Sequence, residues 1–200
     1  MSLPPLVVYK VGGSLFSLHD LADRLRQTWR DRPETLPLLV VGGGAAVDAV
    51  RDWDLTFQLG ADEAHWLAIE ALDLSAGLLV RLMPELRLVR SRNQLQLAQA
   101  DGRPAVLCVT CFMKWLETQA IPLPHSWEVT SDSIAAAAAA DWQAQELVLL
   151  KSCDLPSATD LPTLAESGLV DPYFPVAARD LNRITWSNLR TMTQQTLAPG

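Results

Sequence analysis

A lysine followed by two glycines and a serine stands at the end of the first apolar run of the chain. These residues are Lys10, Gly12, Gly13 and Ser14. Adjacent glycines let consecutive backbone N–H groups converge on one point, and such a concavity binds anions. A lysine two residues earlier can bring its ammonium group to the same point, and a phosphoryl group requires this combination of donors. We therefore predict that Lys10 is catalytic and that the turn binds the phosphates of ATP; a purely structural glycine turn is the alternative.

A second run of glycines, at Gly42, Gly43 and Gly44, follows another apolar run. Two glycine turns at strand ends suit a reaction between two anions, and we assign the second turn to the acceptor. Arg51 lies further along the helix predicted after this turn, where it can bind an acceptor phosphate or simply face solvent. A dinucleotide-binding fingerprint would need Gly or Ala where Val47 stands, which argues against a dinucleotide-dependent oxidoreductase. The chain also lacks a Walker phosphate-binding loop.

A third group of candidate residues comes from the later part of the chain. Asp132 falls in the first turn of a predicted helix, where it can orient a lysine, help to hold Mg²⁺ or only favour the helix dipole. Lys151, Ser152 and Asp154 lie at the end of another predicted strand. We predict that Asp132 and Lys151 are catalytic and that Ser152 and Asp154 bind the ATP phosphates. An ordinary surface ion pair of Lys151 with Asp154 is the alternative.

Histidines, a tryptophan and two cysteines complete the residues considered for chemistry. His125 and Trp127 can line a pocket, with Trp127 stacking on a flat substrate ring, although a core tryptophan is the alternative. His65 lies within a predicted helix, and we expect a packed histidine there rather than a catalytic one. Cys108 and Cys111 are three apart on a predicted strand, so their side chains should point to opposite faces. We therefore expect no redox or metal role for this pair.

Composition restricts the class of protein. The chain has 200 residues, 49% of them hydrophobic, which suffices for one sizeable core and favours a single domain. A net charge of −7 argues against a nucleic-acid or anionic-membrane partner. The longest apolar stretch, residues 64–83, is interrupted by Glu70, Asp73 and Arg81, so it does not read as a membrane span. With three cysteines and no leader-like opening, we expect a cytoplasmic protein without a disulfide framework.

Strands and helices alternate along the chain. We predict strands at residues 6–11, 38–41, 86–89, 105–109 and 146–150. We predict helices from Ser17 to before Pro33, at residues 45–51, 61–83, 91–100 and 131–140, and near 161–166 and 176–181. The helix at 61–83 should place Leu67, Ala71, Leu74, Leu78 and Leu82 on its inward face. This alternation indicates an α/β domain with a mainly parallel sheet, whose ligands bind at the carboxyl ends of the strands.

Taken together, these motifs resemble the amino acid kinase superfamily, which includes acetylglutamate, carbamate, aspartate and UMP kinases. The matching stretches are residues 10–14, 42–44, 130–136 and 149–154, in that order. The resemblance implies a three-layer αβα sandwich, Mg-ATP as phosphoryl donor and direct in-line transfer. It also implies that Lys10 contacts the transferred phosphate and that Asp132 organises the lysines, with Mg²⁺ brought by ATP and Asp132 as its one candidate protein ligand.

Three stretches resemble a narrower group, the methanofuran-biosynthesis kinases that phosphorylate aminomethylfuran-methyl phosphate. These stretches are residues 62–66, 123–136 and 170–175. The resemblance implies an acceptor phosphate at the second glycine turn, and charge complementarity suggests Asp48 or Glu70 as the partner of the substrate ammonium. The residues we assign to the acceptor are Gly42, Gly43, Gly44, Asp48, Arg51, His125, Trp127 and Thr130. A UMP kinase-like enzyme and a non-catalytic nucleotide-binding or storage protein are the alternatives.

The later part of the chain departs from the superfamily pattern. Many members are longer and carry a second catalytic lysine on a late glycine-rich stretch, whereas no lysine follows Lys151 here. We therefore expect one domain over residues 1–200, with an acceptor-side portion at 1–130 and a reduced nucleotide-side portion at 131–200. Its partner would be a small phosphorylated substrate. The apolar character of residues 61–83 favours a homo-oligomer.

Overall fold

The computed structural model describes residues 3–120, 122–156 and 160–197. Its centre is a seven-stranded sheet with strand order β3-β4-β2-β1-β5-β6-β7. Neighbouring strands are parallel except for β6 and β7, which pair antiparallel at one edge. The strands are β1 (Leu6–Val11), β2 (Leu36–Val41), β3 (Arg87–Val89), β4 (Ala105–Leu107), β5 (Glu146–Lys151), β6 (Ile184–Asn188) and β7 (Thr193–Thr196).

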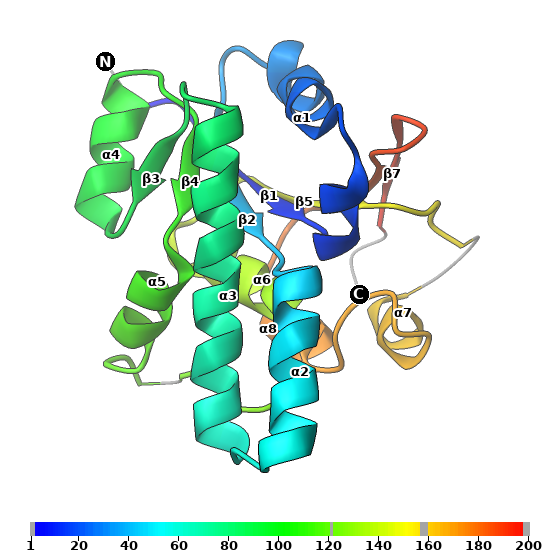
Figure 1. Cartoon of the computed structure of the whole chain (residues 1–200). Coiled ribbons are helices and arrows are strands. Elements are labelled where there is room, and N and C mark those ends of the chain that lie inside the picture. The colour runs from blue at the N-terminus through cyan, green and yellow to red at the C-terminus, as the bar shows by residue number, and fades with distance from the viewer. Residues whose placement is uncertain (1–2, 121, 157–159, 198–200) are drawn as a thin grey trace.

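Helices flank this sheet, so the predicted α/β fold class is confirmed (Figure 1). Helices α2 and α3 lie side by side and are joined by a short turn. A 3-10 helix, η1 (Gly13–Ser17), directly follows β1. The helices are α1 (Leu21–Arg30), α2 (Ala45–Phe57), α3 (Ala61–Leu82), α4 (Arg92–Ala100), α5 (Val109–Leu116), α6 (Ser131–Asp141), α7 (Leu161–Glu166) and α8 (Phe174–Ala177).

The two central strands are buried on both faces, as expected for a parallel sheet covered by helices. Side chains alternate between the faces along a strand. In β1, Leu6 and Val8 pack into the same core as α6, whereas Val7 and Tyr9 pack into the opposite core with α1. Lys10 continues the series of Leu6 and Val8, so the alternation directs its side chain toward α6.

The same alternation applies to β5. Leu147 and Leu149 belong to the α6-side core, and Lys151 continues their series. Strand β1 pairs with β5 so that Lys10 lies opposite Leu149, which places Lys151 two residues beyond it. The two lysines therefore reach the same face at the ends of adjacent strands.

Helix α6 can approach this face closely because its buried residues are small. Ala135, Ala136, Ala138 and Ala139 are almost completely buried, so the alanine run packs against the sheet as its composition suggested. Chain order changes direction between β1 and β5, since β2, β4 and β3 follow on one side and β5, β6 and β7 on the other. In open α/β sheets, ligands bind at the carboxyl ends of the strands at such a point.

Two predicted helices differ from those in the structure. The helix predicted from Ser17 begins only at Leu21, because η1 occupies residues 13–17 and the Ser17 hydroxyl donates to the Ser14 carbonyl. The inward face predicted for α3 is wrong at Leu74, Leu78 and Leu82, which are 68%, 44% and 47% exposed, whereas Ala71 is buried as predicted and Leu67 is half-buried. The buried face instead includes Ile69, Leu72, Ala76 and Leu79.

The cysteine pair and the end of the chain also differ from expectation. Strand β4 ends at Leu107, and Cys108 is the N-cap of α5, so our reason for separating the two cysteines was wrong. The sulfur atoms of Cys108 and Cys111 lie 3.1 Å apart. Strands β6 and β7 were not predicted, and the helix expected near 176–181 is instead the single turn α8. No helix in the described part of the chain has the length and apolarity to cross a membrane.

Candidate active site

Two lysines converge on one buried carboxylate at the ends of β1 and β5. The ammonium groups of Lys10 and Lys151 each lie 2.9 Å from Oδ1 of Asp132. Lys151 also donates to Oδ2 of Asp132 at 3.0 Å and to the carbonyl of Leu169 at 2.6 Å. All three predicted catalytic residues therefore meet, because strand alternation directs the lysines to one face and α6 begins above them.

The electrostatics of this cluster hold two positive charges near one negative charge. Burial, and then repulsion from Lys10, lower the pKa of Lys151 to about 8, although Asp132 opposes both effects. Burial alone would raise the pKa of Asp132, but the two ammonium groups bring it below its usual range. The cluster carries a net charge of +1 when both lysines are protonated. Such a site can stabilise additional negative charge, as on a phosphoryl group in transfer.

The two glycine turns pack backbone against backbone. A Cβ atom on Gly13 would lie 2.5 Å from the nitrogen of Gly44, and one on Gly42 would lie 2.8 Å from the nitrogen of Gly13. Gly44 also has a φ of +53°, a conformation that side chains disfavour. Glycine is therefore required here to let the two turns meet. The predicted ATP-side and acceptor-side turns form one continuous surface beside the lysine pair.

The backbone N–H groups of the turns are used in different ways. Gly12 donates to the carbonyl of Leu150 at 2.9 Å, and Gly42 donates to the carbonyl of Val11 at 2.8 Å. These two residues therefore anchor the turns to the strands. Among the described residues, the N–H groups of Gly13, Gly43 and Gly44 take part in no such turn or cap bond. These three are the donors that the turns can offer to an anion.

The remaining residues predicted to bind ATP phosphates lie around the ends of β1 and β5. The hydroxyl groups of Ser14 and Ser152 are 3.0 Å apart and link the two strand ends. Asp154 instead accepts hydrogen bonds from Asn188 at 2.8 Å and from Thr193 at 3.0 Å. The bond from Asn188, followed by that from Thr193, lowers the pKa of Asp154. Asp154 thus ties the loop after β5 to the last two strands and is exposed at its outer side.

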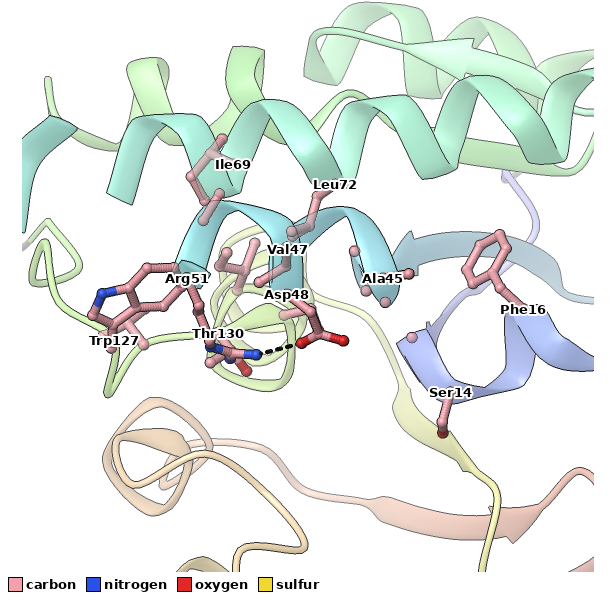
Figure 2. Close-up of a pocket in the computed structure, with 18 of the residues that line it drawn as sticks. Ser14, Phe16, Ala45, Val47, Asp48, Arg51, Ile69, Leu72, Trp127 and Thr130 are labelled. Carbon is pink, nitrogen blue, oxygen red and sulfur yellow. Dashed lines mark hydrogen bonds and ion pairs between the residues drawn. The ribbon is translucent and has the colours of Figure 1, made fainter. Parts of the chain in front are cut away.

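A cavity of about 570 Å³ opens beside the glycine turns. Ser14, Gly43 and Gly44 line one part, and apolar side chains such as Val47, Ile69 and Leu72 line its middle. Figure 2 shows Ile69 and Leu72 descending from α3 toward Val47 on α2, with Ser14 and Phe16 at one end and Trp127 at the other. The polar turns adjoin an apolar cavity, which is suitable for a ligand with a charged end and an apolar body.

Seven of the eight predicted acceptor residues line this cavity: the three glycines Gly42, Gly43 and Gly44, and Asp48, Arg51, Trp127 and Thr130. Arg51 and Asp48 form an ion pair of 2.9 Å, marked in Figure 2. The guanidinium of Arg51 also lies 5.0 Å from the centre of the Trp127 ring. The indole N–H of Trp127 donates to Asp54 at 3.0 Å, and this hydrogen bond fixes the orientation of the ring. Glu70, the other candidate for an ammonium partner, is exposed and is not part of this cavity wall.

His125 stands behind the cavity wall rather than in it. Its Nδ1 is 2.8 Å from Asp62 and its Nε2 is 2.9 Å from Glu117. Its ring stacks on that of His65, with centres 4.5 Å apart. His65 does line the cavity, although we had expected only a packed histidine.

One buried atom in this wall has no hydrogen bond. Nε2 of His65 lacks a partner among the described residues, and an unsatisfied buried polar group typically costs about 1–3 kcal/mol. Burial, and then the charge of His125, lower the pKa of His65 to about 4. The imidazole of His65 is therefore neutral at pH 7.

Asp171 positions the start of α6 and was missed as a site residue. It is buried and accepts from the backbone N–H and hydroxyl of Thr130 at 3.0 and 2.9 Å. It also accepts from the N–H of Ser133 at 3.0 Å and from the Ser133 hydroxyl. The helix that carries Asp132 is thereby capped from a distant part of the chain. In the sequence, Asp171 was indicated only by the resemblance of residues 170–175 to the methanofuran-biosynthesis kinases.

The site fits ATP phosphates better than a metal ion held by the protein. Both oxygens of Asp132 are engaged by lysine ammonium groups, so the carboxylate serves the lysines and offers no unshared oxygen to Mg²⁺. The described residues contain no group of three or more His, Cys, Asp or Glu side chains arranged to hold a metal ion. A magnesium ion would have to come with the nucleotide, whose phosphates would provide its ligands.

Comparison with known proteins gives a family and several structural neighbours. The model of the amino acid kinase family matches residues 5–154. No curated protein matches the sequence significantly. Among solved structures, the UMP kinase of Ureaplasma parvum superposes with a TM-score of 0.67 and 13% identity, covering 95% of this chain and 92% of its own.

Two further solved structures are similar. The uridylate kinase of Archaeoglobus fulgidus has a TM-score of 0.62 and 17% identity, covering 96% of this chain and 91% of its own. The UMP kinase of Bacillus anthracis has a TM-score of 0.65 and 13% identity, covering 93% and 88%. At these identities the structural similarity extends to the fold, and the similarity covers nearly the whole length of both chains.

Proposed function

Because the chain belongs to the amino acid kinase family, we propose that it transfers the γ-phosphoryl group of Mg-ATP to a phosphate monoester. The observation that carries this proposal is the convergence of Lys10 and Lys151 on Asp132 beside two joined glycine turns. A reaction between two phosphates brings several negative charges together. Two ammonium groups and free backbone donors at one point are suited to holding them.

Each part of the site has a separate role in this proposal. Lys10 and Lys151 stabilise the charge on the phosphoryl group while it passes between donor and acceptor. Asp132 keeps the two ammonium groups together and prevents their mutual repulsion from separating them. Gly13, Ser14 and Ser152 bind phosphates of ATP, and Gly43, Gly44 and Arg51 bind the phosphate of the acceptor. Magnesium, when bound with ATP, supplies further neutralisation of phosphate charge.

We favour aminomethylfuran-methyl phosphate or a close analogue as the acceptor. The three stretches that resemble the methanofuran-biosynthesis kinases touch one another in the structure. His125 of the second stretch contacts Asp62 of the first, and Thr130 of the second contacts Asp171 of the third. The first two stretches line the cavity, through His65 and Trp127, and the third supports the second from behind, which favours a shared role in binding the acceptor. The apolar middle of the cavity and Trp127 suit a small flat ring.

UMP is the second candidate acceptor. The solved neighbours named above are UMP or uridylate kinases, and their similarity covers nearly the whole chain. A nucleoside monophosphate also combines a phosphate with a flat ring. Both acceptors would place a phosphate at the lysine pair and the glycine turns. They differ in the ring that the distal part of the cavity would bind.

ADP release in the presence of Mg-ATP tests the proposal directly. Purified protein is incubated with a panel of phosphate monoesters that includes both candidates, and thermal shifts report binding of each acceptor separately. We expect ADP release that depends on ATP, Mg²⁺ and one acceptor. Lys10→Ala should abolish turnover, whereas the matched variant Lys114→Ala, in α5 outside the site, should retain it. Binding of ATP and acceptor without ADP release would reject the kinase and favour a nucleotide-binding protein.

We also propose that the protein forms a homo-oligomer through α3. Leu74, Leu78 and Leu82 are exposed on this helix. Residues four apart lie on the same face of a helix, so the three leucines form one exposed apolar stripe that favours association. Sedimentation velocity should show a dimer or a larger assembly that Leu78→Glu shifts toward monomer. A monomer at micromolar concentration would contradict this part of the proposal.

A further inference from the structure

We propose that His65 forms a subsite that binds an N–H donor at the end of the acceptor opposite its phosphate. This inference rests on the proposed function, because it names the acceptor class of the same cavity. His65 is 4% exposed, lines the cavity and has an Nε2 atom without a partner among the described residues. A buried polar atom without a partner calls for an explanation, and in a cavity wall a bound ligand is an explanation that can be tested.

Burial is the main reason why the ring of His65 is neutral, and the neighbouring His125 adds to this effect. His125 stacks on the His65 ring, and each nitrogen of His125 lies beside a carboxylate, Asp62 or Glu117. A neutral imidazole offers one donor nitrogen and one acceptor nitrogen.

The charges around this part of the cavity favour an N–H donor as the ligand group. Asp62 and Glu117 contact His125, Asp54 contacts Trp127, and Asp48 contacts Arg51. The negative charge of these carboxylates attracts the positive end of an N–H group, whether the group is an ammonium or a neutral imide.

The position of His65 sets the length of the acceptor. A Cβ atom on Gly43 would lie 3.2 Å from the side chain of Leu72, so Leu72 marks the level of the phosphate-binding turn. His65 precedes Leu72 by seven residues on α3, which corresponds to about 10 Å along the helix axis. The apolar residue Ile69 lies between them and also lines the cavity. The acceptor is thus a phosphate monoester of a flat ring with an N–H group on the far side.

Paired acceptors can distinguish whether that N–H group belongs to an ammonium or to an imide. One pair is aminomethylfuran-methyl phosphate and its analogue with methyl in place of aminomethyl. The other pair is UMP and N3-methyl-UMP, which lacks the imide proton. In each pair, only the first member can donate to His65, and the member that binds identifies the source.

The test compares wild type with His65→Phe, which keeps a flat ring, and with His65→Gln, which can still accept a hydrogen bond. For the N–H acceptor, His65→Phe should lower kcat/KM about 10-fold or more, mainly through KM, and His65→Gln should restore part of the loss. For the acceptor without the N–H group, wild type and both variants should differ less than about twofold. An equal loss for both members of a pair would show a merely structural role and overturn the inference.

A binding measurement separates this inference from the kinase proposal. The ¹⁵N signals of His65 are followed by NMR in wild-type protein titrated with each acceptor in the absence of ATP, and their disappearance in His65→Phe assigns them. A change in the Nε2 signal that only the N–H acceptor causes supports the subsite even if no acceptor is phosphorylated. If the Nε2 signal stays unchanged while the acceptor binds, Nε2 of His65 does not contact the acceptor. That result would overturn the subsite and leave the kinase proposal unaffected.

Discussion

The depressed pKa of Lys151 predicts a specific loss of activity at alkaline pH. An ordinary lysine has a pKa near 10.5, and burial and Lys10 bring that of Lys151 to about 8. At pH 9, a lysine with this pKa is protonated in roughly one molecule in ten, whereas an ordinary lysine is protonated in nearly all. If Lys151 must carry its charge to stabilise the phosphoryl group, kcat/KM should fall about fivefold between pH 8 and pH 9.

The assay is the pH profile of kcat/KM and of kcat with respect to ATP. The kcat/KM profile reports ionisations of the free enzyme, so it should bend near pH 8. The kcat profile should bend at higher pH, because bound phosphates favour the charged ammonium group. Asp132→Asn removes the carboxylate that supports the charge, so any residual activity in this variant should decline at lower pH than in wild type.

A flat kcat/KM up to pH 9.5 in an active enzyme would refute this reasoning. It would mean that Lys151 keeps an ordinary pKa or that its charge does not contribute to turnover. The stability of the protein provides a second check on the sign. Since the pKa of Lys151 is lower in the folded than in the unfolded state, its destabilising contribution is full below about pH 8 and is relieved as the pH rises toward 10.5.

Three further predictions concern the turns, the cap of α6 and the cavity wall. Gly13→Ala places a Cβ atom 2.5 Å from the nitrogen of Gly44, so we expect turnover to be lost and unfolding in urea to be easier by about 1–3 kcal/mol; normal activity would show that the turns need not touch. Asp171→Asn weakens the cap made with Thr130 and Ser133 and should cost about 1–3 kcal/mol while lowering kcat/KM; unchanged values in denaturation and kinetics would remove Asp171 as a positioning residue. His65 binds its proton more weakly when folded, so stability present above pH 6.5 is lost as the pH falls toward 4, by about 2 kcal/mol between pH 7 and 5. Denaturation of His65→Phe at the two pH values should lack this part of the loss, and equal acid sensitivity in both proteins would contradict it.

Much of the fold could be predicted from local patterns in the sequence. Apolar runs ending in glycine or lysine identified β1, β2 and β5, because strands buried on both faces need continuous apolar sequence. Their parallel arrangement brings their carboxyl ends together, so Lys10 and Lys151 could be expected to lie close to each other. Asp132 could be placed beside them only by resemblance, since nothing local shows which helix begins above a given strand.

Other features depend on packing that no local pattern reveals. The buried face of α3 was predicted wrongly because leucines occur all round the helix: Leu72 and Leu79 are buried, whereas Leu78 is exposed, and local sequence does not distinguish them. The stack of His65 on His125 joins residues 60 positions apart in the sequence. Asp171 caps α6 from more than 30 residues downstream. Such contacts depend on the tertiary arrangement, which local residue preferences do not specify.

The central claim is that Lys10, Asp132 and Lys151 form the centre of phosphoryl transfer from ATP to a phosphate monoester. Phosphorus NMR of a reaction with Mg-ATP and the acceptor tests this claim most directly, because it identifies both products. We expect wild-type protein to form ADP and a new diphosphate ester in equal amounts, and Lys10→Ala to form neither. Release of orthophosphate without a diphosphate ester, or equal product formation by Lys10→Ala, would contradict it.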